Sequence, residues 1–196
     1  MASLVQSISD MVSPKPTALL AVADECEEIE VVGLSEVLAR AGVRVTVASV
    51  NEDRADHVVT LAKGTMIQAD KSIELCTQDE YDAIVVPGGP GAKVLGASAT
   101  LTDLLRKQKA AGKLYGGLCA GSLDVLYRNK LVSGPMTTYP QLKDELGDLF
   151  VDEAVVVSGN CVTSQSPGTA IAMGLKLVEL LRGENTAREV AKHLNA

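Results

Sequence analysis

The sequence has 196 residues, of which 46% are hydrophobic, and this is enough chain for one domain with a sizeable apolar core. A net charge of −7 and an aromatic content of 3% argue against nucleic-acid binding, which needs a positive surface and, for single strands, stacking side chains. No apolar run is long enough to span a bilayer, so we expect no membrane partner.

The N-terminal segment differs from the rest of the chain. Residues 1–15 are predicted to form a flexible extension, and residues 16–196 a single domain. The extension lacks the basic start of a secretory signal, and a cleaved targeting sequence is the lesser alternative. The four cysteines are widely spaced without a C-x-x-C pair, which favours free thiols in a reducing compartment. We therefore predict a cytoplasmic location.

Strand and helix signals alternate in chain order. A compact apolar run predicts a strand over 17–23, and apolar residues at helical spacing predict a helix over 28–41 that stops at Gly42. Alternating valines predict a second strand over 43–47. The later elements are strands over 83–86 and 114–118, a helix over 100–111, a hairpin of 154–157 and 161–164, and helices over 167–181 and 185–194.

This alternation is typical of an α/β fold with a mostly parallel sheet covered by helices on both faces. In such sheets, ligands bind beyond the carboxyl ends of the strands. Three segments meet that description, namely residues 24–30, residues 87–91 and the turn that contains Cys119. We expect a functional site where these segments meet.

The pentapeptide Gly117-Leu118-Cys119-Ala120-Gly121 joins a predicted strand to a predicted helix. A tight turn of small residues around a nucleophile has the geometry of a nucleophile elbow, here with sulfur in place of a hydroxyl. The N-terminus of the following helix would favour the thiolate form of Cys119. The alternative is a buried, unreactive cysteine, because free cysteine is often buried.

The first of the three segments carries Glu25, Glu27, Glu28 and Glu30 around Cys26. Acidic residues favour a helix N-terminus, which accounts for two or three of these glutamates. Crowding of like charges disfavours ionisation, so we expect one carboxyl to have a raised pKa and to hydrogen-bond the Cys119 sulfur. Cys26 is either a neighbour of Cys119 or a small apolar filler.

Gly88 and Gly89 directly follow a buried strand. They form either an ordinary turn or, with the Ala120 N–H, a set of backbone donors that stabilises an anion. The histidines, His57 and His193, lie away from the strand ends and are expected at the surface. No zinc-ligand spacing and no phosphate-binding glycine motif is present, so we expect neither a metal nor a cofactor.

Several motifs occur together in one order: Glu27-Glu28-Ile29-Glu30, Val86-Pro87-Gly88-Gly89, Leu118-Cys119-Ala120-Gly121, Thr138-Tyr139-Pro140 and Ser164 to Thr169. This set resembles the ThiJ/PfpI superfamily, and within it the DJ-one branch of parkinsonism-associated deglycases. The resemblance extends from about Thr17 to Leu194. It implies a flavodoxin-like three-layer α/β sandwich and a homodimer, with the helix that begins near Glu28 in the interface.

The resemblance also implies roles for individual residues. Cys119 corresponds to the reactive cysteine, and Glu30 to a protonated glutamate that hydrogen-bonds its thiolate. Gly89 and Ala120 correspond to the backbone donors of the oxyanion hole. Gly88, Tyr139 and Pro167 belong to the surrounding pocket. Tyr139 departs from those members that have histidine at this position, so proton transfer would fall to Glu30.

The resemblance implies a cofactor-independent, glutathione-independent glyoxalase or protein deglycase, with a small aldehyde or a glycated protein as its partner. Cys119 would attack the carbonyl carbon of a 2-oxoaldehyde, and Glu30 would act as general acid and base. The alternative is a redox sensor that protects against oxidative stress, in which Cys119 is oxidised to a sulfinic acid. A peptidase is less favoured, because the motif lacks a histidine base.

Overall fold

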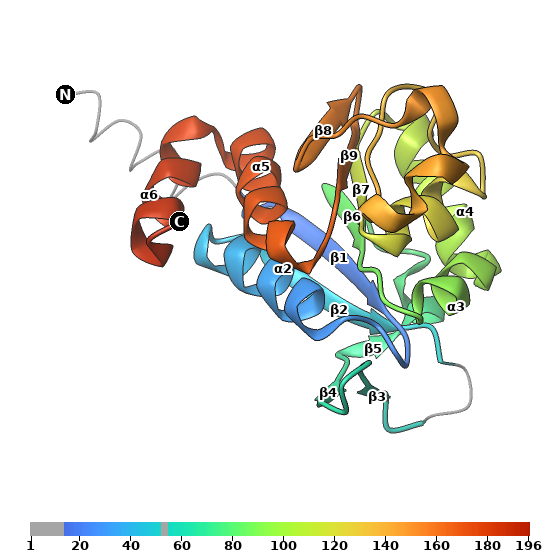
Figure 1. Cartoon of the computed structure of the whole chain (residues 1–196). Coiled ribbons are helices and arrows are strands. Elements are labelled where there is room, and N and C mark those ends of the chain that lie inside the picture. Colours follow the sequence, from blue (N-terminus) through green and yellow to red (C-terminus); the bar gives the residue numbers. More distant parts are fainter. Residues whose placement is uncertain (1–13, 52–54) are drawn as a thin grey trace.

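The computed structural model describes residues 14–51 and 55–196 of the chain. Figure 1 shows a central sheet with helices packed on both of its faces, and the separate pair of strands β3 (Val58–Thr60) and β4 (Met66–Gln68) beside one end of it. The flexible extension predicted for residues 1–15 lies, for residues 1–13, outside the described part. Among the described residues, no helix is long and apolar enough to cross a membrane.

The main elements follow the predicted alternation closely. The strands are β1 (Thr17–Val22), β2 (Arg44–Ser49), β3 (Val58–Thr60), β4 (Met66–Gln68), β5 (Lys71–Ser72), β6 (Ala83–Val86), β7 (Leu114–Leu118), β8 (Val155–Ser158) and β9 (Cys161–Ser164). The α-helices are α2 (Glu28–Arg40), α3 (Ala92–Ala97), α4 (Ala99–Ala110), α5 (Ala170–Arg182) and α6 (Glu184–Leu194). Short helical turns are η1 (Ile73–Cys76), η2 (Ser122–Tyr127), η3 (Pro140–Glu145), η4 (Gly147–Leu149) and η5 (Pro167–Thr169).

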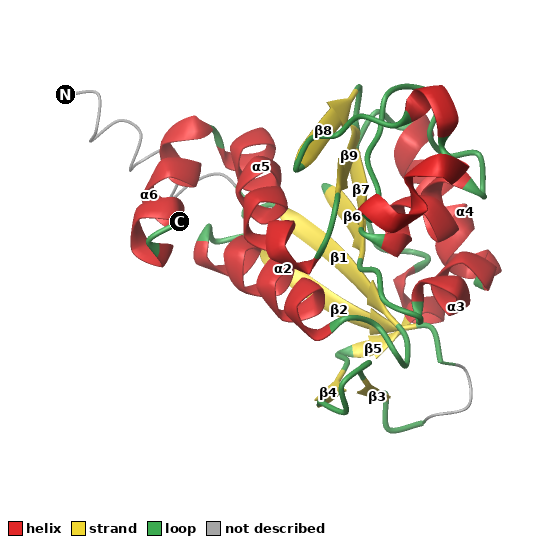
Figure 2. Ribbon diagram, in the orientation of Figure 1, coloured by secondary structure: helices red, strands yellow, loops and turns green. Residues whose placement is uncertain are grey.

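The central sheet has seven strands in the order β5-β2-β1-β6-β7-β9-β8 (Figure 2). All neighbouring pairs are parallel except β8 and β9, which form the predicted hairpin. The three central strands β1, β6 and β7 are almost entirely buried, as continuous apolar runs in a parallel sheet should be. The flavodoxin-like α/β class predicted from the sequence is confirmed.

Helices α2 and α5 pack against each other on one face of the sheet, with α6 beyond them, whereas α4 lies on the other face (Figure 1). The α2–α5 contact is close, because a Cβ atom at Gly174 would lie 2.8 Å from Val37 Cβ. Glycine therefore lets the two helices approach at this point. Apolar residues from both helices and from the central strands form one core.

The structure differs from the predicted elements in four places. The helix predicted over 167–181 begins with the 3₁₀ turn η5 and becomes α-helical only at Ala170. The hairpin of β3 and β4 and the short helix α3 were not predicted, because strands of three residues and a helix of six are too short to show a period. The helix expected after Cys119 forms as the six-residue π-helix η2, a type that is frequent at functional sites.

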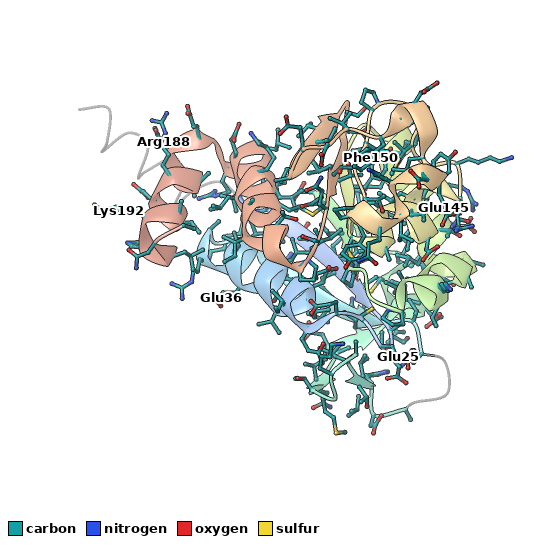
Figure 3. The ribbon with its side chains drawn as sticks, in the orientation of Figure 1. Glu25, Glu36, Glu145, Phe150, Arg188 and Lys192 are labelled. Carbon is teal, nitrogen blue, oxygen red and sulfur yellow. The ribbon has the colours of Figure 1, made fainter. Side chains whose placement is uncertain are left out.

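The order of the strands decides where the three candidate segments meet. Strand β6 pairs with β1 on one side and with β7 on the other, in parallel. The segments that follow these strands, residues 23–27, 87–91 and 119–121, therefore leave the same edge of the sheet side by side. Figure 3 labels Glu25 in the first of them, at the carboxyl end of β1.

Candidate active site

Cys119 occupies a strained position at the end of β7. Its backbone φ is +57°, which is uncommon for a residue other than glycine. The Cys119 N–H donates to the Ser164 carbonyl at 2.9 Å, and its own carbonyl accepts from the Ser122 N–H at 3.2 Å. The hydroxyl of Thr138 donates to the same carbonyl at 2.8 Å. These three bonds hold the elbow in its left-handed conformation.

The glycines around Cys119 allow the two neighbouring loops to touch. A Cβ atom at Gly88 would lie 2.7 Å from Cys119 Cβ and 2.8 Å from the Ala120 nitrogen. A Cβ atom at Gly121 would lie 2.4 Å from the Pro87 carbonyl oxygen. All three distances are shorter than a real Cβ atom permits, so only glycine fits at positions 88 and 121. Cys119 is consequently 93% buried, with 7% of its surface exposed.

Two backbone N–H groups act on the sulfur. Those of Gly89, whose φ is +83°, and Ala120 favour the charged form of the Cys119 thiol and so act to lower its pKa. They come from the loops after β6 and β7 and converge because these strands are adjacent. This is the arrangement expected from the sequence for Gly89 and Ala120, and it can stabilise negative charge that develops beside the sulfur.

The glutamates of the first segment have separate functions in the fold. Glu27 caps α2, because its Oε2 atom accepts from the Glu30 N–H at 3.0 Å. Glu28 accepts from the backbone N–H of Lys63 and so ties the segment to the β3–β4 hairpin. Glu25 is exposed, with a φ of +63°. Glu30 is the one glutamate that is fully buried, and it is directed to the site.

The two carboxyl oxygens of Glu30 have different surroundings. Oε2 accepts from the Gly88 N–H at 2.6 Å. Among the described residues, buried Oε1 has no partner with normal hydrogen-bond geometry. The Cys119 thiol is the side chain whose interaction with this carboxyl shifts its pKa. One oxygen thus fixes the carboxyl group, and the other is free to exchange a proton.

Burial raises the pKa of Glu30 from 4.5 to about 7. The hydrogen bonds from Gly88 and Cys119 act in the opposite direction, and the charge of Glu27 adds to the increase. The raised pKa agrees with the expectation that one carboxyl in this segment is hard to ionise. A carboxyl that titrates near neutral pH can act both as an acid and as a base.

The lowered thiol pKa predicted for Cys119 is not observed. Burial raises the pKa of this thiol to about 12, and the charge of Glu30 is the second largest cause of the increase. The hydrogen bonds from Ala120 and Gly89 act in the expected direction but do not outweigh burial. Near neutral pH the sulfur therefore keeps its proton, whereas the Glu30 carboxyl group is divided between its charged and its protonated form. Activation of the thiol requires that this proton move to Glu30.

The other predicted pocket residues make fewer contacts with the site. Tyr139 is half-buried and precedes η3, and its hydroxyl has no hydrogen bond with Cys119 among the described contacts. Pro167 begins η5, beyond the end of β9. Cys26 is fully buried, and its sulfur accepts from the Ala23 N–H at 3.3 Å, which favours the interpretation of Cys26 as a filler. His193 is exposed on α6, as predicted.

Two residues of the site were not singled out from the sequence. Thr138 and Ser164 are fully buried, and both hydrogen-bond the backbone of Cys119. Both belong to motifs that carried the family resemblance, which was the available signal. Their contact with Cys119 joins segments 19 and 45 positions away along the chain, and no local pattern marks such a contact.

We predict that Glu30→Gln stabilises the protein above neutral pH. The pKa of Glu30 is 4.5 before and about 7 after folding, so between these values the folded chain binds more protons and its free energy of unfolding falls as pH rises. Glutamine keeps an acceptor for Gly88 but carries no charge. Urea unfolding at pH 8 should give a gain of up to ~3 kcal/mol, and at pH 4 almost none.

Glu36→Gln is the matched control for this measurement, because Glu36 lies on the exposed side of α2 and pairs with Arg40. Its effect should be small at both pH values. A Glu30→Gln variant that is less stable than wild type at pH 8 would contradict the buried, hard-to-ionise state of this carboxyl.

Comparison with known proteins shows the family to which the chain is related. The model of the DJ-1/PfpI family matches residues 16–180. Protein dj-1beta of Drosophila melanogaster is 38% identical over 183 residues, covering 91% of this chain and 96% of its own. A Caenorhabditis elegans protein named glutathione-independent glyoxalase DJR-1.2 is 33% identical over 187 residues, covering 94% and 98%.

Solved structures agree with the sequence relatives. The crystal structure of Drosophila melanogaster DJ-1beta has a TM-score of 0.88 and 37% identity, and it covers 93% of this chain and 99% of its own. Oxidized Toxoplasma gondii DJ-1 has a TM-score of 0.87 and 37% identity, covering 91% and 97%. The family model spans more than half of the sequence and includes all three loops of the site, and the chain therefore belongs to the DJ-1/PfpI family.

Proposed function

We propose that the protein is a glutathione-independent glyoxalase that converts 2-oxoaldehydes such as methylglyoxal into hydroxy acids. The observation that carries this proposal is the Glu30 carboxyl group. It is fully buried beside the Cys119 sulfur, it titrates near pH 7, and Oε1 accepts no hydrogen bond of normal geometry from the described residues. The glyoxalase name of the Caenorhabditis elegans relative, which this chain matches over 94% of its length, supports the same chemistry.

The first step forms a carbon–sulfur bond. The Cys119 thiol gives its proton to Glu30 Oε1 while the sulfur attacks the aldehyde carbon. The electron pair of the carbonyl moves to its oxygen, which the N–H groups of Gly89 and Ala120 stabilise. Glu30 then protonates this oxygen, giving a hemithioacetal and a free carboxylate.

The second step moves hydrogen between the two carbonyl carbons. The Glu30 carboxylate removes the proton from the former aldehyde carbon and delivers it to the adjacent ketone oxygen, which gives an enediol. The carboxylate then takes the hydroxyl proton from the sulfur-bearing carbon and delivers it to the adjacent carbon, which gives a thioester of the hydroxy acid. Water then cleaves the carbon–sulfur bond, which releases the acid and restores the thiol. The sum is addition of one water to the oxoaldehyde, without a redox partner.

The depth of the sulfur favours small substrates. Only 7% of the Cys119 surface is exposed, and the loops that cover it are in backbone contact through Gly88 and Gly121. A free aldehyde of three carbons reaches such a sulfur more readily than an adduct on the side chain of a folded protein. The protein deglycase activity is the corresponding reaction on the larger substrate, and we propose it as the lesser one.

We predict that Cys119→Ala and Glu30→Gln each abolish lactate production from methylglyoxal. The first removes the nucleophile, and the second removes the base while it keeps the hydrogen bond with Gly88. Lactate is measured without glutathione or added metal, and loss of at least about a hundredfold in kcat is expected for either variant. Cys161→Ala, at a buried cysteine of β9, serves as the matched control. Wild-type turnover at the background rate, or full activity of either site variant, would overturn the proposal.

A second candidate function is a redox sensor that acts in protection against oxidative stress. Cys119 is the most exposed of the four cysteines, at 7% against 0 to 3% for the others. Two molecules of hydrogen peroxide would convert its thiol into a sulfinic acid, with two new sulfur–oxygen bonds and release of two waters. The N–H groups of Gly89 and Ala120 would then hold the anionic oxygens, and a protonated Glu30 would donate a hydrogen bond.

This candidate predicts selective oxidation. Mild peroxide should add two oxygens to Cys119. Cys26, Cys76 and Cys161 should stay reduced, because their side chains are less exposed than that of Cys119. Mass spectrometry of the tryptic peptides measures this, with Glu30→Gln as the variant in which the sulfinic form should become less abundant. Oxidation of all four cysteines at one rate would contradict a sensor role.

We also propose that the protein forms a homodimer with α2 in the interface. We propose that this dimer is cytoplasmic. The resemblance to the DJ-1/PfpI family implies a homodimer with α2 in its interface. Ile29 and Val32 lie on one side of α2 and are 58% and 53% exposed, an unusual exposure for two adjacent apolar residues. Free thiols at all four cysteines favour a reducing compartment.

The dimer predicts that Val32→Glu shifts the chain toward a monomer in sedimentation equilibrium. A carboxylate at the centre of an apolar contact would be buried without a partner. Leu75→Glu is the matched control, because Leu75 is 64% exposed on η1 and outside the proposed face. A wild-type chain that sediments as a monomer at micromolar concentration would contradict the dimer.

A further inference from the structure

The Thr138 hydroxyl is fully buried and donates to the carbonyl oxygen of Cys119 at 2.8 Å. The segment that contains it lies across the end of β9. The Thr137 N–H donates to the Thr163 hydroxyl at 3.0 Å, and the Met136 N–H donates to the Leu149 carbonyl. Hydrogen bonds to β9 and to η4 therefore hold the segment that contains Thr138 in place.

The carbonyl that Thr138 contacts belongs to the same peptide group as the Ala120 N–H. A peptide group is planar, so a bond that fixes its oxygen also fixes the direction of its N–H. A hydrogen bond to the oxygen also polarises the group and makes its N–H a stronger donor. The Ala120 N–H is one of the two donors that act on the sulfur.

The same peptide group follows the residue with a φ of +57°. A residue other than glycine leaves this region readily unless its surroundings hold it there. Rotation toward a relaxed conformation would turn the Ala120 N–H away from the sulfur. The Ser122 N–H also donates to the carbonyl, at 3.2 Å, so loss of Thr138 would weaken this restraint without leaving the oxygen unpaired.

We propose that Thr138 is a positioning residue for the oxyanion hole, which it orients and polarises through the Cys119–Ala120 peptide group. The inference rests on the proposed glyoxalase function. Thr138 does not touch the substrate, and its effect is exerted on the transition state through Ala120. Its removal therefore lowers kcat and leaves KM nearly unchanged.

The neighbouring residue provides a matched control. Thr137 is also fully buried, but among the described residues its hydroxyl has no hydrogen-bond partner. Threonine and valine have nearly the same shape, so the same substitution at positions 137 and 138 removes one hydroxyl in each case. Only at position 138 does that hydroxyl act on the elbow.

The experiment compares Thr138→Val, Thr138→Ser and Thr137→Val in methylglyoxal turnover. We expect Thr138→Val to lower kcat about tenfold with KM within about twofold, because an indirect donor contributes less than a direct one. Thr138→Ser keeps the hydroxyl and should recover kcat to within about threefold of wild type. Thr137→Val should keep the wild-type kcat. Equal kcat values for the two valine variants would overturn the proposal.

A second readout does not depend on turnover. The rate at which iodoacetamide alkylates Cys119, followed by peptide mass spectrometry across pH, reports how well the Ala120 N–H supports the thiolate. In Thr138→Val the profile should shift to higher pH by roughly half a unit, and in Thr137→Val it should not shift. An unshifted profile would count against the proposal even if wild type turned over no methylglyoxal. Thr138→Ala replaces the valine variant if circular dichroism shows that the latter is unfolded.

Discussion

The site depends on the burial of one carboxyl group beside one sulfur. Glu30 and Cys119 are both buried away from water. A negative charge on either group is therefore unfavourable, and the pKa of each is raised. Together they bind one exchangeable proton above about pH 7 and two below it. The fold tolerates this because the Gly88 N–H stabilises one carboxyl oxygen and the Gly89 and Ala120 N–H groups face the sulfur.

Backbone geometry, more than side chains, makes this pairing possible. Cys119 and Gly89 have positive φ values, and Gly88 and Gly121 leave no room for a side chain between the loops after β6 and β7. The result is a nucleophile elbow in which N–H groups converge from two adjacent strands. Strain at such positions is held by the surrounding hydrogen bonds, here from Ser122, Ser164 and Thr138. Stability and reactivity are therefore linked at the same few residues.

The family resemblance implies that some members have histidine at the position of Tyr139, and Glu30 offers a group for proton transfer that needs no imidazole. Glu30 titrates near neutral pH, and its Oε1 atom has no hydrogen bond of normal geometry within the part of the chain that the structure describes, so acid and base steps can use the same group. The Tyr139 side chain is half-buried and has no hydrogen bond to Cys119 among the described contacts. In the proposed mechanism, proton transfer therefore requires a single carboxyl group, which moves one proton between sulfur, oxygen and carbon.

The sequence by itself determined the order of the main strands and helices, the α/β class and the loops that carry Cys119, Glu30 and Gly89. These features follow from periodicity and from small residues at strand ends, which are local properties. The local pattern of four glutamates left open which of them enters the site, and only the family resemblance pointed to Glu30. The tertiary structure decided it, because the direction of Glu30 depends on how α2 is capped and on its packing against the sheet. It also reversed the predicted direction of the Cys119 pKa and brought Thr138 to the Cys119 carbonyl. Burial and contacts between distant segments exist only in the folded chain, so no local pattern could reveal them.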